Sequence, residues 1–152
     1  MTREKIIEII LIKNIHKMEN VFVDTNVVID LLAKREPFYK DAQDLFTLSD
    51  KNEIELFISS LTFANAYYSI VKHHKDVDAK KYLSKFKVLV TILSLEDKAI
   101  ELALASDFKD FEDGLQYFIA MDNDADIIIT RNKKDFKSSK IPVMTAGEYL
   151  KK

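Results

Sequence analysis

Four short apolar runs, separated by segments with helical spacing, limit the fold of this chain more than any other feature. The runs occupy residues 21–23, 56–58, 88–93 and 127–129. Short runs of branched and aromatic residues are typical of strands that are buried on both faces of a sheet. Strands that alternate with helices form a parallel sheet with helices on both sides. The sequence therefore predicts an α/β fold, a three-layer α/β/α arrangement around a central, mostly parallel sheet of four to five strands.

The fifth strand would come from residues 141–143, and only at an edge of the sheet, because Pro142 cannot donate a backbone hydrogen bond. Between the strands, apolar residues three or four positions apart predict helices. Three predicted helices begin after Asp24, after Pro37 and after Ser59-Ser60, with inward-facing residues Val28, Leu31 and Leu32 in the first, Phe38, Ala42, Leu45 and Phe46 in the second, and Leu61, Ala64, Tyr68 and Val71 in the third. Three more are predicted over 75–86, 96–106 and 113–123. The helix over 75–86 is mostly solvated, and the other two face inward with Ile100, Ala103 and Leu104, and with Leu115, Phe118 and Ile119.

The first seventeen residues differ in character from the rest of the chain. Their apolar stretch, residues 6–12, is interrupted by Glu8 and is too short to span a bilayer. No signal-peptide cleavage pattern follows it, so a cytoplasmic location is expected. We predict an N-terminal extension over 1–17, helical over 6–11, and one folded domain over 18–152. The sequence leaves open whether the extension is a docking helix or an upstream addition.

Composition narrows the chemistry. The chain has no cysteine and only three histidines, which excludes disulfides and disfavours zinc sites. A bound metal would have oxygen ligands, as Mg²⁺ and Mn²⁺ prefer. The formal net charge of −2 argues against non-specific coating of DNA. It is compatible with an enzyme that has a local acidic site.

Acidic residues are predicted to gather at one edge of the sheet. Asp24 follows the first strand, and Asp135 lies just after the fourth. Asp113 begins a helix that leads into the fourth strand, and the six residues 107–112 before it can extend roughly 20 Å, enough to return along a helix of about 16 Å. Ligands bind beyond the carboxyl ends of such strands. Because clustered carboxylates repel one another unless a cation lies among them, the pattern favours metal-dependent hydrolysis of a phosphodiester.

Four blocks of the sequence resemble, in order, PIN domains of the VapC toxin type. They are 21–32 (VFVDTNVVIDLL), 58–65 (ISSLTFAN), 110–117 (DFEDGLQY) and 127–136 (IIITRNKKDF). The resemblance implies a metal-dependent endoribonuclease that uses Mg²⁺ or Mn²⁺, the toxin of a toxin–antitoxin pair, with an RNA substrate such as a tRNA loop, a cognate antitoxin and a homodimeric assembly. It implies a catalytic set of Asp24, Asp113, Asp135 and Asn65, with Asp24, Asp113 and Asp135 (or Asn132) binding the metal, and Thr25, Asn26, Thr130 and Asn132 positioning ligands and water.

One position departs from the family pattern. PIN domains of this type usually carry a glutamate where this chain has Asn65. An amide oxygen can bind a metal but brings no charge, so either metal affinity is weaker or nearby Glu112 compensates. A catalytically weak or inactive PIN module that binds RNA or protein is therefore the alternative. A phosphatase of the haloacid-dehalogenase type is disfavoured, because it needs a second aspartate where this chain has Asn26.

Simpler structural roles also exist for these residues. Asp24 could cap the helix that follows it, and Asp113 could complement a helix dipole. Asp135 could cap a turn or pair with a lysine. Arg131, Lys133 and Lys134 are either RNA-phosphate contacts or solvated surface groups.

Overall fold

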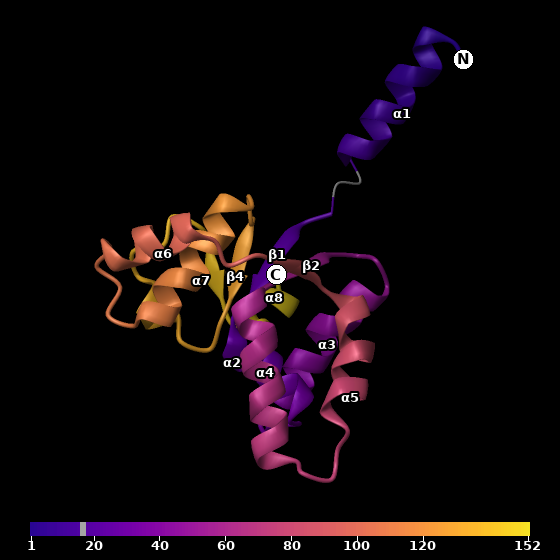
Figure 1. The fold of residues 1–152 in the computed structure, drawn as a ribbon. Coiled ribbons are helices and arrows are strands. Elements are labelled where there is room, and N and C mark those ends of the chain that lie inside the picture. The colour runs from indigo at the N-terminus through magenta and orange to yellow at the C-terminus, as the bar shows by residue number, and fades with distance from the viewer. Residues whose placement is uncertain (16–17) are drawn as a thin grey trace.

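In the computed structural model, which describes residues 1–15 and 18–152, five strands form one parallel sheet (Figure 1). The strands are β1 (Asn20–Val23), β2 (Glu55–Ser59), β3 (Thr91–Leu93), β4 (Ile127–Ile129) and β5 (Val143–Met144), in the spatial order β3-β2-β1-β4-β5. All four pairings are parallel. The predicted α/β fold is confirmed, and the short edge strand is present, although β5 spans Val143–Met144 and not the predicted 141–143. Its neighbour Pro142 joins the sheet through its carbonyl, which accepts from Ile128 N at 2.9 Å.

The helices cover both faces of this sheet. One face carries α2 (Thr25–Leu32), α3 (Tyr39–Asp50), α4 (Ser60–His73), α5 (Ala79–Phe86) and α8 (Ala146–Leu150), and the other carries α6 (Asp97–Leu104) and α7 (Phe111–Asp122). Two 3₁₀ helices, η1 (Lys87–Leu89) and η2 (Lys133–Phe136), lie in connections. Figure 1 shows α6 and α7 on the opposite side of the strands from α4 and α5.

The alternating side chains of the strands build these layers. Val21 and Val23 pack into the core under α2–α5, whereas Phe22 between them packs under α6 and α7. Strand β4 behaves in the same way, with Ile127 and Ile129 on one face and Ile128 on the other. Successive strand residues point to opposite faces, so an entirely apolar strand requires a helical layer on each side. The predicted three-layer architecture is thereby explained.

Helix α4 presents a different face to the core from the one predicted. Its buried residues are Thr62, Ala66 and Ile70, whereas Tyr68 is 68% exposed. The side chain of Ser59 caps the helix by accepting from Thr62 N at 3.0 Å, which directs Thr62 inward at the first turn. Apolar residues lie on most sides of this helix, so spacing alone could not identify the inner one. The predicted inward residues that are only partly buried or exposed are Leu61, Ala64, Tyr68 and Val71.

Helix α6 also differs from its prediction, because Leu104 is 71% exposed rather than buried. Small residues determine how α6 packs. Ala99 and Ala103 are buried, and a methyl group on Gly114 of α7 would lie only 3.3 Å from Cβ of Ala103. The two helices thus approach closely along their small residues, which leaves the larger Leu104 in solvent.

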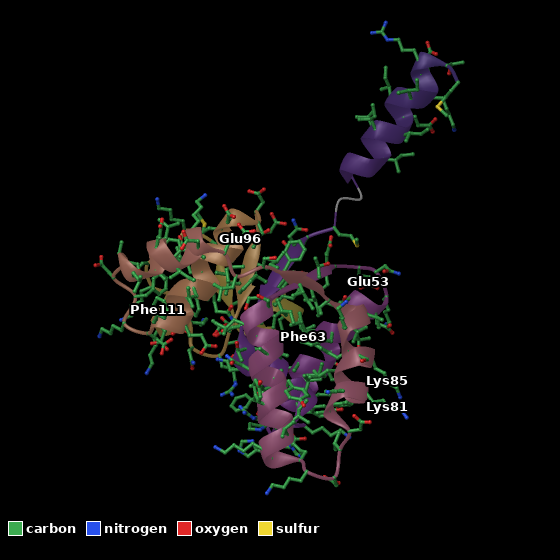
Figure 2. All side chains as sticks on the ribbon, in the orientation of Figure 1. Glu53, Phe63, Lys81, Lys85, Glu96 and Phe111 are labelled. Carbon is green, nitrogen blue, oxygen red and sulfur yellow. The ribbon has the colours of Figure 1, made fainter. Side chains whose placement is uncertain are left out.

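Several predicted boundaries shift. Helix α5 begins at Ala79 instead of 75, because Asp78 accepts from Lys81 N and caps it. It buries Leu83, while Lys81 and Lys85 point away from the domain (Figure 2). Strand β3 is limited to its last three residues, since η1 takes up the start of the predicted strand. Helix α7 begins two residues before Asp113, with Asp110 as its cap.

The predicted N-terminal helix is longer than expected, α1 (Arg3–Ile15), and it extends away from the sheet and its covering helices (Figure 1). Ile6, Ile7 and Ile10 on it are about half exposed, at 45–52%. None of the helices in the described residues has the length and apolar content needed to cross a membrane.

Candidate active site

The carboxyl ends of β1 and β4 form the point where the strand order reverses. From β1 the chain moves outward to β2 and β3, and then returns to place β4 and β5 on the other side. Asp24 follows β1 and Thr130 follows β4, and the Thr130 hydroxyl donates to Asp24 Oδ2 at 2.8 Å. Such a reversal opens a crevice between diverging connections, where α/β proteins bind ligands. Asp24 therefore stands at the position that the topology makes available for a ligand.

Asp24 is held rigidly and with little access to water. It is the N-cap of α2, and its Oδ1 accepts from Thr25 N at 2.8 Å. Asn26 Nδ2 lies 3.4 Å from Asp24 Oδ2, and Gln116 Nε2 lies 3.4 Å from Asp24 Oδ1. Although these hydrogen bonds favour the ionised form, desolvation by burial raises the pKa of Asp24 above its ordinary value. The side chain thus caps a helix, and burial makes its ionised form costly in the folded protein.

A cavity of about 730 Å³ opens beside Asp24 and gathers most of the predicted site. Asp113 reaches it from α7, and Asp135 reaches it from η2. Thr130 lies behind Asp24 and is fully buried, and Asn65 is not among the lining residues. The predicted site residues that line the cavity are Asp24, Thr25, Asn26, Asp113, Asn132 and Asp135. Their roles as ligands remain predictions.

Negative charge accumulates around Asp113. Desolvation by burial, followed by the nearby charges of Asp24, Asp110, Asp135 and Glu112, raises the pKa of Asp113 to about 7. A divalent cation would relieve this repulsion, and the available donors are oxygens, which suit Mg²⁺ or Mn²⁺. Among the described residues no three acidic or histidine side chains converge tightly enough to form a complete metal site. The cavity therefore presents carboxylate oxygens, which suit a divalent cation, but they are not close enough together to form a complete coordination sphere.

A buried polar network beneath Asp24 was not predicted. Gln116 is fully buried, and its Nε2 donates to Thr62 Oγ1 at 2.7 Å and to Thr25 Oγ1 at 3.1 Å. The two threonine hydroxyls are themselves 2.7 Å apart. The network links α2, α4 and α7 directly under the candidate site. A signal did exist in the sequence, because Gln116 interrupts the otherwise apolar stretch 114–121, about one turn after Asp113.

Arg131 pairs with a buried carboxylate, whereas the sequence alone allows either an RNA-phosphate contact or a solvated surface group. Its Nε and Nη2 donate to the two oxygens of Asp30 at 2.7 and 3.1 Å. Asp30, which was not predicted to take part, is only 1% exposed, and the Arg131 guanidinium lies 4.0 Å from the centre of the Phe38 ring. This ion pair ties the loop that follows β4 to α2.

A family match spans β1 to β4 and includes Asp24 and Asp113, and it ends just before Asp135 and β5. Residues 20–134 match the family model described as PIN domain. The chain belongs to the PIN-domain family. Ribonuclease VapC1 of Aquifex aeolicus is 34% identical over 142 residues, which cover 88% of this chain and 95% of that protein. The resemblance to PIN domains of the VapC type is therefore confirmed.

Solved structures share the fold of this PIN domain. VapBC2 from Rickettsia felis, bound to a DNA fragment from its promoter, matches with a TM-score of 0.63 and 19% identity, over 83% of this chain and 98% of that chain. A toxin–antitoxin complex from Klebsiella pneumoniae matches with a TM-score of 0.63 and 23% identity, over 83% of this chain and 97% of that chain.

The crowding at Asp113 makes the stability of this PIN domain depend on pH. The folded protein binds the Asp113 proton up to about pH 7, whereas the unfolded chain releases it near 3.8. Stability should therefore fall as pH rises through this window. An Asp113→Asn variant should be more stable than wild type by about 2 kcal/mol at pH 8, after allowance for partial solvent screening, and by little below pH 4. Urea unfolding in EDTA between pH 4 and 8 measures the difference, and a gap that stays constant with pH would contradict the prediction.

Proposed function

We propose that this PIN domain is a divalent-metal-dependent endoribonuclease, and that it acts as the toxin of a toxin–antitoxin pair. The observation that carries the proposal is the meeting of Asp24 and Asp113 at one cavity, at the reversal point of the sheet. The ribonuclease activity named for the 34% identical relative supports it. Structured RNA, such as a tRNA loop, is the proposed substrate.

In this proposal, Asp24, Asp113 and Asp135 hold Mg²⁺ or Mn²⁺. The bound ion would supply charge neutralisation at the phosphate and a polarised water. Thr130 fixes the orientation of Asp24 through its hydroxyl, and Asn132 N donates to that same hydroxyl at 3.1 Å. The protein therefore contributes a rigid carboxylate whose supports come from the loop that also carries Asp135.

Cations at the rim of the cavity would receive the RNA backbone. Arg35, Lys109, Lys134 and Lys137 line the same cavity as the acidic residues. Basic side chains attract phosphates, and the acidic centre between them would otherwise repel RNA. These local positive charges would allow the protein to bind RNA although its net charge is negative.

Hydrolysis of this type has a diagnostic product. Water attacks phosphorus, the P–O3′ bond breaks, and the fragments carry a 5′-phosphate and a 3′-hydroxyl. A contaminating ribonuclease that uses the 2′-hydroxyl leaves a cyclic phosphate instead and does not need a metal. With end-labelled tRNA we expect internal cuts in Mn²⁺ or Mg²⁺, 3′-hydroxyl ends, and no cleavage in EDTA or by Asp113→Asn. Cleavage that persists under both conditions would refute the proposal.

Asn65 motivates a second candidate, a PIN module that binds RNA or protein but cuts poorly. It would bind tRNA in a filter assay without cleaving it, and Asn65→Glu would gain activity. If wild type and Asp24→Asn cleave equally while Asn65→Glu cleaves faster, this candidate replaces the first.

We also propose binding partners for the domain and a separate N-terminal extension that contains the first helix. A cognate antitoxin is proposed because the related solved structures named above include a VapBC complex and a toxin–antitoxin complex. A homodimer, a cytoplasmic location and the division into an extension (1–17) and a PIN domain (18–152) are proposed with it. Light scattering of the full chain and of a chain lacking 1–17 tests whether the extension contributes to assembly.

A further inference from the structure

We propose that Glu112 supplies to the metal site of this PIN domain the carboxylate that position 65 lacks, and that Asn65 is the positioning residue that holds it there. The inference rests on the proposed metal-dependent nuclease and concerns which side chains complete its acidic set. Its starting point is a contact between helices that are far apart in the sequence, because Asn65 Nδ2 donates to Glu112 Oε1 at 3.0 Å.

The carboxylate of Glu112 is oriented from two sides. Besides the Asn65 amide on α4, the Thr25 hydroxyl at the start of α2 donates to the same oxygen at 3.3 Å. Within the described part of the chain, Glu112 Oε2 has no hydrogen-bond donor, and no lysine or arginine forms an ion pair with Glu112. One oxygen is therefore fixed by neutral donors, and the full negative charge remains for another ligand.

The position of Glu112 matches the role. Glu112 lines the same cavity as Asp24 and Asp113, whereas Asn65 does not. Thr25 joins the two carboxylates. Its hydroxyl donates to Glu112, and its backbone N–H donates to the neighbouring Asp24, the N-cap of α2. The carboxylate at 112 thus enters the acidic cavity from α7, and the amide at 65 stands behind it.

The asparagine is explained by the same contact. A glutamate at 65 would bring a second carboxylate against Glu112, and two negative groups this close repel each other strongly. An amide instead offers an N–H donor, which a carboxylate prefers as a neighbour. The carboxylate and the amide should therefore be interchangeable between the two positions. The site would accept a carboxylate at 112 with an amide at 65, or a carboxylate at 65 with an amide at 112.

Direct Mn²⁺ binding, followed by calorimetry and by the electron paramagnetic resonance signal of free Mn²⁺, separates these roles without an activity assay. Glu112→Gln should weaken Mn²⁺ binding by about 10- to 100-fold, the usual range for a lost supporting or binding group. Asn65→Ala should weaken it only a few-fold, because the charge remains. The swap variant Asn65→Glu/Glu112→Gln should recover most of the affinity. Glu101→Gln, an exposed glutamate on α6, is the charge-matched control.

The outcomes distinguish this inference from the function on which it rests. If Asp24→Asn weakens Mn²⁺ binding but Glu112→Gln behaves like Glu101→Gln, the metal site stands and the role of Glu112 is overturned. If Glu112→Gln weakens binding and the swap variant does not recover it, the exchange between positions 65 and 112 is overturned. If Asp24→Asn has no effect either, the metal-dependent nuclease itself fails.

Discussion

An Asp24→Asn variant of this PIN domain is expected to lose RNA cleavage by at least about 100-fold, the scale seen when one preorganised charge-stabilising group is removed. Asparagine keeps the shape of the side chain, and its one amide oxygen can still accept from Thr25 N, while its NH2 group would face the Thr130 hydroxyl, which can also act as an acceptor. What it removes is the negative charge at the reversal point of the sheet. The loss is measured as the initial rate of tRNA cleavage in Mn²⁺, with Asp76→Asn, an exposed aspartate in a turn, as the matched control.

The same substitution should leave the fold at least as stable as wild type. Burial raises the pKa of Asp24, which means that its ionised form is costly in the folded protein at neutral pH. Replacing it with a neutral isostere removes that cost, so the free energy of unfolding measured in urea and EDTA should not decrease. A variant that still cleaves within threefold of wild type would show that Asp24 is only a helix cap. A variant that unfolds would leave its activity loss attributable to structure.

The sheet and the approximate site were predictable because both depend on local patterns. Val21–Val23 and Ile127–Ile129 are entirely apolar, which requires cover on both faces and thereby a parallel α/β arrangement. A parallel sheet in turn places the residues after its strands at one edge, so Asp24 and Asp135 could be assigned to a common cavity from their positions alone.

The side chains that support the site could not be assigned in this way. Glu112 and Asn65 are 47 positions apart, and Arg131 and Asp30 are 101 apart. Each pair meets only after two helices, or a helix and a loop, have packed in a particular rotation. Helix α4 illustrates the difficulty, because the polar Thr62, bonded to the Ser59 cap, faces inward while Tyr68 and Val71 are exposed. The rotation of a helix about its own axis decides which side chains meet. The spacing of apolar residues does not determine that rotation when a helix is apolar on several sides.

The buried Asp30–Arg131 ion pair gives the largest expected effect on stability. Asp30→Ala removes both acceptors of the Arg131 guanidinium, whose side chain is 28% exposed, and leaves its charge poorly compensated beside the Phe38 ring. Breaking a buried pair from one side costs roughly 3–5 kcal/mol, and partial hydration of Arg131 places the expected loss near the lower end, about 3 kcal/mol. Asp44→Ala is the matched control, because Asp44 pairs with Lys40 at 2.8 Å on the surface of α3. An exposed pair of that kind contributes at most about 1 kcal/mol.

A double substitution decides whether charge pairing or packing causes the loss. If an unpaired charge is the cause, Asp30→Leu/Arg131→Met should restore most of the unfolding free energy, since apolar residues of similar volume often replace a buried pair without cost. A double-mutant cycle measures this coupling directly. Because Arg131 lies between Thr130 and Asn132, Asp30→Ala should also lower tRNA cleavage under conditions where the variant remains folded, by loosening the loop that orients Asp24. Equal losses for Asp30→Ala and Asp44→Ala would mean that the buried pair does not hold this loop to α2.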